Sequence, residues 1–333
     1  MTTPEPLAEV RDLHVRFVGR ENTVHAVNGV SFTVNPGKVL CILGESGSGK
    51  SVTLRALMRL LPVQAKIEGT VRAAGRDVLA LRGKALRDLR GGEVSMIFQE
   101  PMTALDPVYT IGQQIGETVR RHTGCDRAKA WARALELLEL VRIPSAERRL
   151  DAYPHELSGG LRQRAMIAMA LSCDPRLLLA DEPTTALDAT VQIQVLILLR
   201  KIQRELGMGM IFVTHDLGVA AEIADTVAVM YAGRIVESGP VGRILAAPLH
   251  PYTAGLLAST VHGQPRDRDI DAIPGSPPDM RRLPRGCAFA PRCSRRREGC
   301  LATVPPEHYP EPGRMAACIA IEKHAEDTLL VHG

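Results

Sequence analysis

The sequence has few aromatic residues, little excess of charge and no long hydrophobic run. Phe, Trp and Tyr make up 3% of the 333 residues, so side chains on which nucleic-acid bases could stack are scarce. The net charge of +4 is too small to indicate a nucleic-acid partner by itself. No run of roughly 18 apolar residues occurs, and residues 1–5 lack the features of a secretory signal. We therefore expect neither a membrane-spanning nor an exported protein.

Hydrophobic residues make up 45% of the chain and charged residues 23%, which is ordinary for a globular protein. A chain of this length can bury a sizeable core, and a main domain with an appendage is the simplest expectation. The seven cysteines are unevenly distributed. Four of them crowd the last fifth of the chain: Cys287, Cys293, Cys300 and Cys318. Without an export signal, we expect reduced thiols or metal ligands.

Short apolar runs of strand length punctuate the first 240 residues, at 39–43, 177–180, 210–213 and 227–230. Each run is followed by a turn or by a segment with helical character. Residues 190–206, for example, carry an apolar stripe that suits a helix packed on a sheet. Buried strands alternating with amphipathic segments predict an α/β fold with a parallel sheet covered by helices.

Three other regions depart from this alternation. Residues 8–17 and 30–34 indicate antiparallel strands. Between residues 100 and 157 the strand signals vanish, and we expect a helical insertion that includes a helix at 127–141. After residue 263, ten prolines and a group of arginines leave little for a hydrophobic core. We expect a small extension held by a metal or cluster, with a disordered basic tail as the alternative.

One segment carries phosphate-binding chemistry. It consists of Gly44, Glu45, Ser46, Gly47, Ser48, Gly49, Lys50 and Ser51. It lies between a strand-like and a helix-like run, the context that the nucleotide-binding pattern G-x-x-x-x-G-K-[ST] requires. Glycines let backbone N–H groups converge on phosphate oxygens, and the next helix directs its positive end at the same anions. We expect Lys50 to reach the β- and γ-phosphates and Ser51 to bind Mg²⁺.

Two adjacent acids follow the apolar run at 177–180. Asp181 is expected near the Mg²⁺, and Glu182 can polarise a water for attack on the γ-phosphate. Adjacent acids at the end of a strand are more often a polar cap. Together with a phosphate loop, they predict hydrolysis of a nucleoside triphosphate.

A third segment narrows the choice among nucleotide hydrolases. Residues 157–164 read LSGGLRQR, which resembles the signature motif of ABC-transporter ATPases. The order of motifs over residues 7–240 is similar to that family as well. After the phosphate loop come Gln99, the signature, the acidic strand, Asp188 and His215. The resemblance implies a P-loop NTPase fold of the ABC type, with an antiparallel β subdomain, a helical subdomain at about 100–157, and ATP with Mg²⁺ as ligands.

The branch of the family is indicated by further residues. Leu161 stands where the family usually has glutamine, which resembles the oligopeptide/dipeptide permease branch. Residues 101–107 (PMTALDP), residues 250–253 (HPYT) and the late cysteines strengthen this likeness. The related nickel-uptake branch is the alternative. In the peptide-permease branch, residues 241–333 would form a C-terminal extension.

The signature implies a paired assembly. Ser158 is a natural N-cap, and with Gly159 and Gly160 it stands at the start of an expected helix, where anions bind. The resemblance implies that these residues close on the γ-phosphate of ATP held by a second subunit. Hydrolysis would then let the two subunits part.

The resemblance assigns roles to four more residues. Gln99 is expected to reach Mg²⁺ or the attacking water, and His215 to contact the γ-phosphate. Asp188 is expected to shape the seam between the subunits. Phe17 is our candidate for the aromatic that stacks on adenine, with a place in the core as the alternative.

The late cysteines are spaced Cys287-x5-Cys293-x6-Cys300-x17-Cys318, which matches neither a zinc ribbon nor a short ferredoxin run. Four thiolates can still bind a [4Fe–4S] cluster or Zn²⁺. The resemblance implies the iron–sulfur cluster, which some members of this branch hold. Zinc and free or partly oxidised thiols are the alternatives.

The sequence thus predicts the ATP-hydrolysing subunit of an ABC importer for di- or oligopeptides, at the cytoplasmic face of the inner or plasma membrane. The implied partners are a second ATPase subunit, expected to be a non-identical homologue, two membrane-spanning permease subunits and an extracytoplasmic solute-binding protein. The alternatives are an importer of nickel or another small solute and an ABC-type ATPase acting on nucleic acid. No direct nucleic-acid contact is expected, because the two fused cassettes or long coiled coil usual in that class are not visible.

Overall fold

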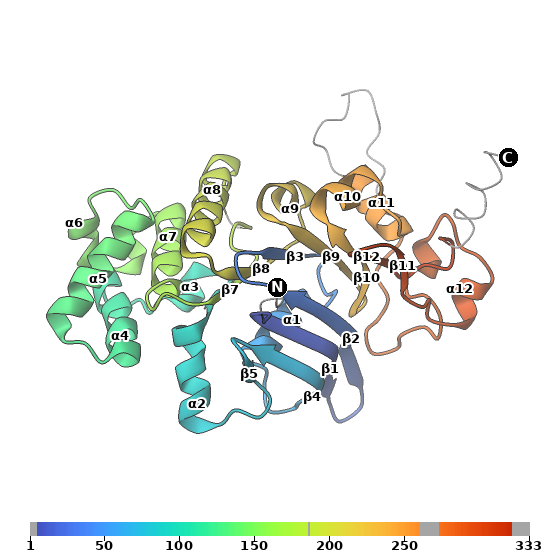
Figure 1. Cartoon of the computed structure of the whole chain (residues 1–333), viewed down its shortest axis with the longest axis horizontal. Coiled ribbons are helices and arrows are strands. Elements are labelled where there is room, and N and C mark those ends of the chain that lie inside the picture. The colour runs from blue at the N-terminus through green and yellow to red at the C-terminus, as the bar shows by residue number, and fades with distance from the viewer. Residues whose placement is uncertain (1–4, 186, 260–272, 322–333) are drawn as a thin grey trace.

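Two β-sheets of different construction organise the chain (Figure 1). The computed structural model describes residues 5–185, 187–259 and 273–321. In spatial order, the larger sheet contains β11 (His308–Glu311), β12 (Arg314–Ala316), β10 (Arg234–Pro240), β9 (Thr226–Tyr231), β3 (Val39–Leu43), β8 (Gly209–Thr214), β7 (Leu177–Asp181) and β6 (Val94–Ile97). The smaller sheet contains β2 (Thr23–Val34), β1 (Ala8–Val18), β4 (Ala65–Ala73) and β5 (Arg76–Asp77).

The centre of the larger sheet is parallel. Strands β6, β7, β8, β3 and β9 pair side by side in the same direction, and β10 is antiparallel to β9. All residues of β3, β7 and β8 are buried, as expected of strands covered on both faces. The four predicted apolar runs lie in β3, β7, β8 and β9, so the predicted parallel sheet is confirmed.

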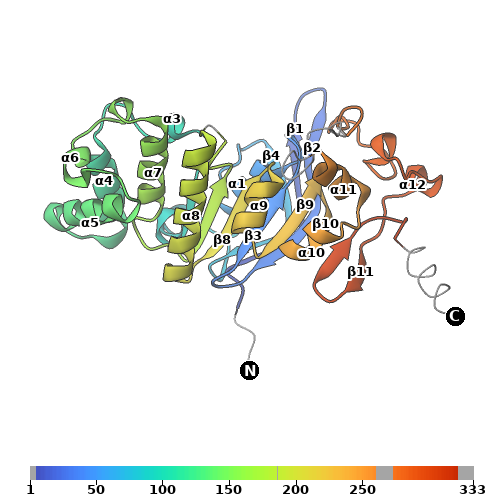
Figure 2. The same cartoon turned by 90° about the horizontal axis from the view of Figure 1, so that it is seen from above.

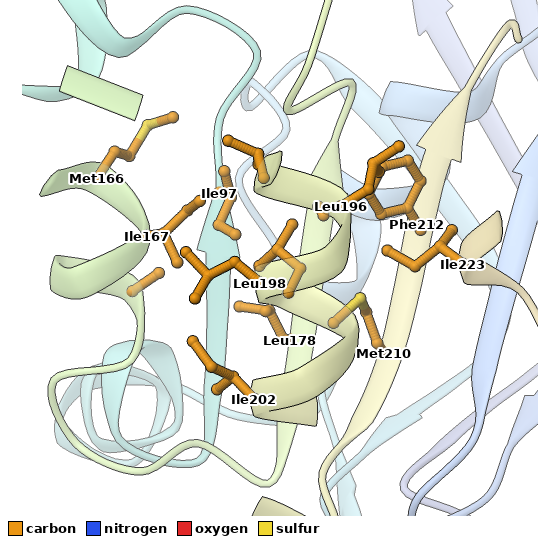
Figure 3. Close-up of a cluster of buried hydrophobic side chains, with 14 of the residues drawn as sticks. Ile97, Met166, Ile167, Leu178, Leu196, Leu198, Ile202, Met210, Phe212 and Ile223 are labelled. Atoms are coloured by element: carbon orange, nitrogen blue, oxygen red, sulfur yellow. The ribbon is translucent and has the colours of Figure 1, made fainter. Parts of the chain in front are cut away.

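Alternate residues of strand β3 are buried in two different hydrophobic cores, one on each face of the sheet. Cys41 and Leu43 of β3 belong to the core on the face covered by helices, whereas Leu40 and Ile42 belong to the core between the two sheets. This division follows from the two-residue period of a strand. Figure 3 shows part of the helix-side core, where Leu198 of helix α8 (Ala189–Leu206) lies among side chains of the sheet.

The α-helices are α1 (Lys50–Leu57), α2 (Gly83–Asp88), α3 (Pro101–Ala104), α4 (Ile111–Thr123), α5 (Arg127–Leu140), α6 (Ala146–Leu150), α7 (Gly159–Ala170), α8 (Ala189–Leu206), α9 (Leu217–Ile223), α10 (Val241–Ala246), α11 (Pro251–Ala258) and α12 (Gly299–Ala302). The predicted helices at 127–141 and 190–206 are confirmed as α5 and α8. Helices α3 to α6 lie between β6 and β7 in the chain. They form the end of the molecule opposite the C-terminal extension (Figure 2).

The smaller sheet is antiparallel, with β1 between β2 and β4. The predicted strand at 30–34 is only the end of β2, which begins at Thr23. Polar residues and Gly29, which has a φ of 83°, interrupt the apolar pattern of its first half. Register shifts between β1 and β2 accommodate these residues, so pairing with β1 extends the strand beyond its apolar part.

The C-terminal extension adds strands to the edge of the larger sheet. Strand β12 pairs with β10, placing Ala316 opposite Glu237 and Met315 opposite Ser238. Arg314 donates to the carboxylate of Glu237 at 3.2 Å, and both side chains are buried. The carboxylate of Glu237 also accepts two backbone N–H groups, which helps to offset the cost of burying its charge. The alternative of a disordered basic tail is therefore wrong for residues 273–321.

Within the described ranges, no helix combines the length and apolar character needed to cross a bilayer.

His250 connects strand β10 of the larger sheet to helix α11. Its backbone N–H donates to Glu237 at 2.9 Å, and its Nδ1 accepts the N–H of Tyr252 at 3.0 Å as the N-cap of α11. Burial lowers the pKa of His250 from its ordinary 6.5 to about 4. The imidazole is therefore neutral in the folded protein at pH values where a free histidine gains a proton.

We expect the free energy of unfolding to fall as the pH drops below about 6.5. In this range His250 binds a proton in the unfolded chain, whereas in the folded chain it does so only near pH 4. For this group alone the loss approaches about 3 kcal/mol. His250→Asn retains a helix-capping acceptor and should remove this part of the pH dependence, measured by urea unfolding across this range. The exposed His155→Asn variant is the control and should retain it. An unchanged pH dependence in His250→Asn would contradict the assignment.

Candidate nucleotide-binding site

The predicted phosphate loop connects β3 to α1. Gly49 is the N-cap of α1 and has a φ of 105°, in the left-handed region that favours glycine. A side chain at Gly49 would also collide with the backbone carbonyl of Ala26. The loop can therefore keep this tight turn only with glycine at its last position before Lys50.

Lys50 is buried and bonded to its own loop. Its Nζ donates to the carbonyl oxygens of Gly44 at 2.7 Å and Glu45 at 2.9 Å, and lies 3.9 Å from the carboxylate of Glu182. Burial lowers the pKa of Lys50, while the carboxylates of Glu182 and Asp181 act in the opposite direction. Lys50 thus joins the phosphate loop to the acidic end of β7.

Ser51 and Asp181, the two residues expected to hold Mg²⁺, are in contact. The Ser51 hydroxyl donates to Asp181 Oδ1 at 2.7 Å. Burial raises the pKa of Asp181, an effect that the Ser51 hydrogen bond opposes. A hydroxyl and a carboxylate at the phosphate loop are the oxygen donors that Mg²⁺ prefers, so these residues fit the ion.

The carboxylate of Glu182 is the point where several predicted residues meet. Gln99 Nε2 lies 3.4 Å from its Oε2, and His215 Nδ1 lies 3.4 Å from the same oxygen. The backbone N–H of Glu182 donates to the carbonyl of Val213 in β8 at 3.1 Å. Residues from the ends of β6, β7 and β8 are thereby brought together around one acid.

Glu182 has a φ of 46°, which is unusual for a residue other than glycine. Such strained backbone positions cluster at functional sites, where surrounding contacts maintain them. Here the turn directs the side chain of the first residue after β7 back towards Lys50.

Thr185 contacts Glu182, and the sequence analysis did not predict this contact. Its hydroxyl donates to Glu182 Oε2 at 3.0 Å. The only available signal was its spacing, three residues after the acid. The hydroxyl supports the carboxylate oxygen that also faces Gln99 and His215.

Ser158 caps α7, as predicted. Its Oγ accepts the N–H of Leu161 at 3.4 Å, so its side chain bonds within its own helix. Gly159 has open space where a Cβ would lie, whereas Gly160 packs against Val191 of α8. Asp188 caps α8 by accepting the N–H of Val191 at 3.0 Å. The signature and Asp188 are therefore neighbours through Val191.

A pocket connects the signature to the glutamine segment. Its lining includes Gln99, Gly159, Arg162, Pro183 and Leu187. The pocket thus lies between the start of α7 and the residues that follow β7.

Phe17 lies in β1, between Val24 of β2 and Ala65 of β4. Its ring is partly buried and packs against the core between the sheets. The role of Phe17 in stacking on adenine stays a prediction.

Glu45 of the phosphate loop is contacted by two residues of the C-terminal part. The Tyr252 hydroxyl accepts its backbone N–H at 2.9 Å. Arg292 donates to both oxygens of its carboxylate, at 2.7 and 3.0 Å. The hydrogen bond to Glu45 raises the pKa of Arg292, so the guanidinium stays charged. No local pattern predicted these contacts, because 207 and 247 residues separate the partners.

The four late cysteines are free thiols. The backbone N–H of Cys287 donates to the carbonyl of Cys300 at 2.7 Å. Burial raises the pKa of the Cys287, Cys293 and Cys318 thiols, and neighbouring cysteines add to the rise. Among the residues described, no group of three or more His, Cys, Asp or Glu side chains is arranged to hold a metal ion. The predicted iron–sulfur cluster and the zinc alternative are therefore not confirmed.

Two families match the chain. Residues 27–185 match the family described as ABC transporter, and residues 236–300 match the C-terminal region of oligopeptide/dipeptide transporters. A peptide import ATP-binding protein of Brucella melitensis is 52% identical over 91% of this chain and 93% of its own length. The oligopeptide transport ATP-binding protein OppD of Salmonella typhimurium is 47% identical over 95% of both chains.

Solved structures show the same cassette fold. The ATP-binding cassette MJ0796, in a dimeric post-hydrolysis state with ADP and Pi, is 27% identical, with a TM-score of 0.64 over 70% of this chain and 98% of that chain. The cbiO1 protein of Clostridium perfringens, part of an ABC transporter complex, is 26% identical, with a TM-score of 0.62 over 73% of this chain and 92% of that chain.

Thr185→Val should lower the rate of nucleotide hydrolysis roughly tenfold, because the Glu182 carboxylate loses one hydrogen bond that orients it. Nucleotide affinity should change little, since Thr185 contacts Glu182 and not the phosphate loop in this structure. The matched control is Thr185→Ser, which retains the hydroxyl and should hydrolyse nearly as fast as the wild type. Steady-state phosphate release measures both variants. Equal rates for the Val and Ser variants would show that the contact is unimportant.

Proposed function

The chain belongs to the family of ATP-binding subunits of oligopeptide/dipeptide ABC transporters. From this premise we propose roles for its residues in ATP hydrolysis and the partners with which it assembles. The protein is an ATP-hydrolysing subunit of an oligopeptide/dipeptide ABC importer. The match of residues 236–300 favours peptide import over the nickel and nucleic-acid alternatives.

The phosphate loop binds the triphosphate of ATP in this proposal. Backbone N–H groups of the loop and the N-terminus of α1 meet the phosphate oxygens, and Lys50 reaches the β- and γ-phosphates. Ser51 and Asp181 would hold Mg²⁺, and Gln99 would reach either the ion or the attacking water. When bound, Mg²⁺ neutralises charge on the phosphate oxygens. The contact between Ser51 and Asp181 supports this assignment.

Glu182 acts as the general base. Its carboxylate accepts a proton from a water as the water oxygen bonds to the γ-phosphorus. The bond from that phosphorus to the bridging oxygen breaks, its electron pair stays on ADP, and inorganic phosphate leaves. Gln99 and His215 orient the water and the γ-phosphate. The convergence of Gln99, His215 and Lys50 on the carboxylate of Glu182 is the single observation that carries the proposal.

Two ATPase subunits close on ATP in the proposed cycle. Ser158, Gly159 and Gly160 of one subunit meet the γ-phosphate bound by the other, and Asp188 lies at the seam. The exposed Ser158 at the start of α7 supports this role, because a helix N-terminus attracts anions. The dimeric state of the MJ0796 cassette supports the pairing of such domains.

The remaining partners are two permease subunits that span the membrane and an extracytoplasmic solute-binding protein. The second ATPase subunit is proposed to be a non-identical homologue. The names of the relatives, which describe ATP-binding proteins of peptide import, support an assembly at the cytoplasmic face of the membrane.

For the cysteine-rich segment, the finer proposal is a [4Fe–4S] cluster held by Cys287, Cys293, Cys300 and Cys318. Four thiols in one small folded segment have the donor chemistry of such a cluster, which supports the proposal. No step of ATP hydrolysis depends on it.

Glu182→Gln should bind ATP and lose turnover by at least roughly 100-fold, because the amide cannot accept the proton. With ATP and Mg²⁺, the variant and its partner subunit should accumulate as a closed pair, detected by light scattering. The control is Glu205→Gln, an exposed acid on α8 that pairs with Lys201, and it should hydrolyse ATP normally. Wild-type hydrolysis by Glu182→Gln would refute the assignment of the base.

Protein purified without oxygen should contain about four iron and four sulfide per chain and absorb visible light. Cys300→Ser should lose most of this iron, whereas Cys125→Ser, outside the segment, should retain it. Iron-free wild-type protein with four alkylatable late thiols would exclude the cluster and leave the ATPase assignment untouched.

A further inference from the structure

An ion pair between Arg292 and Glu45 connects the C-terminal extension to the phosphate loop. Both terminal nitrogens of Arg292 bond the two carboxylate oxygens of Glu45, the residue after the first glycine of the phosphate loop. The Arg292 side chain is 6% exposed and that of Glu45 26%. This paired geometry is specific to arginine, whose planar fork matches a carboxylate. Burial of the arginine separates this pair from the exposed ion pairs of the surface, which contribute little.

Arg292 is held in place by the extension itself. It ends a 3₁₀ turn, Ala290–Arg292, directly before Cys293. Its Nε donates to the carbonyl of Pro274 at 2.9 Å. The guanidinium also lies 5.9 Å from the ring centre of Tyr231 and 6.0 Å from that of Phe289. The folding of the cysteine-rich segment therefore fixes where this charge lies.

Glu45 has all three of its polar groups engaged. Its N–H bonds Tyr252 at 2.9 Å, its carbonyl oxygen accepts from Lys50 at 2.9 Å, and its carboxylate bonds Arg292. Tyr252 is fully buried and packs on Tyr231 and Phe289, the same rings that face Arg292. One residue of the loop thus connects the extension to Lys50.

The negative charge of Glu45 makes its pairing with Arg292 important for ATP binding. A carboxylate in the loop that receives a triphosphate repels it unless a cation neutralises the carboxylate. The guanidinium of Arg292, which belongs to the extension, is this cation, and the carboxylate of Glu45 bonds it with both oxygens. Without the guanidinium, the negative charge of Glu45 would remain unpaired in the loop, and the loop would lose one of its contacts with the extension.

We propose that Arg292 is a positioning residue of the ATP site, through which the C-terminal extension sets how tightly the phosphate loop holds ATP. This inference rests on the proposed function of residues 44–51 as the ATP phosphate site. It assigns the extension a role in nucleotide binding as well as in completing the sheet.

The test is a double-mutant cycle on the full chain with ATP and Mg²⁺, using equilibrium binding by calorimetry. Arg292→Met retains much of the apolar stem and removes the charge, and it should weaken ATP binding about tenfold. Glu45→Gln removes the unpaired charge, so the double variant should recover ATP affinity to within about threefold of the Glu45→Gln protein. Arg292→Lys, which retains the charge without the planar fork, should fall between wild type and Arg292→Met.

A matched control separates this role from a general loss of charge. Arg281 lies in the same extension and pairs with Asp279, with both side chains exposed. Arg281→Met should leave ATP affinity unchanged. The thermal midpoint of every variant is measured as well, because a purely structural role would lower the midpoint without any recovery of affinity in the double variant.

Unchanged ATP affinity in Arg292→Met, or no recovery in the double variant, would overturn the proposal. Lys50→Ala tests the assumption beneath it, since that variant should lose ATP binding whatever Arg292 does. If Lys50→Ala binds ATP like the wild type, the assignment of the phosphate loop fails. If only the Arg292 cycle fails, the ATP site stands and the extension has no part in it.

Discussion

The parallel pairing of β3, β7 and β8 is the constraint on which the site depends. Parallel strands end at the same edge of a sheet, so the residues that follow them meet there. The register places Leu43 beside Thr214, and Asp181 beside Val213. The phosphate loop, Glu182 and His215 each follow one of these strands, and Asp181 is the last residue of β7. Three segments far apart in the sequence thereby surround the carboxylate of Glu182 without any long loop having to position them.

The same sheet also carries the C-terminal extension. Strand β12 continues the sheet at the edge formed by β10, and the buried pair of Arg314 and Glu237 fastens it there. From this anchored position Arg292 and Tyr252 reach Glu45. The match to the C-terminal region of oligopeptide/dipeptide transporters spans residues 236–300 and so includes both. The region matched by this second family is thus in direct contact with the phosphate loop.

Much of the fold and of the site could be predicted from local patterns. The strands β3, β7, β8 and β9 are short buried runs, and α5 and α8 have helical periodicity over many residues. The phosphate loop is recognisable because its glycines, Lys50 and Ser51 are adjacent in the chain. The first half of β2 escaped prediction, because pairing with β1, and not its own residues, makes it a strand.

The sequence by itself predicted the chemistry of the loop and determined the order of the motifs and the family, since these depend on neighbouring residues and fixed spacings. The tertiary structure alone decided that Thr185 supports Glu182, that β12 completes the sheet and that Arg292 neutralises Glu45. Each of these depends on which surfaces pack together in three dimensions. Arg292 and Glu45 are 247 residues apart, and no local pattern distinguishes this arginine from its neighbours in a basic segment. Only burial beside Tyr231 and Phe289 selects it.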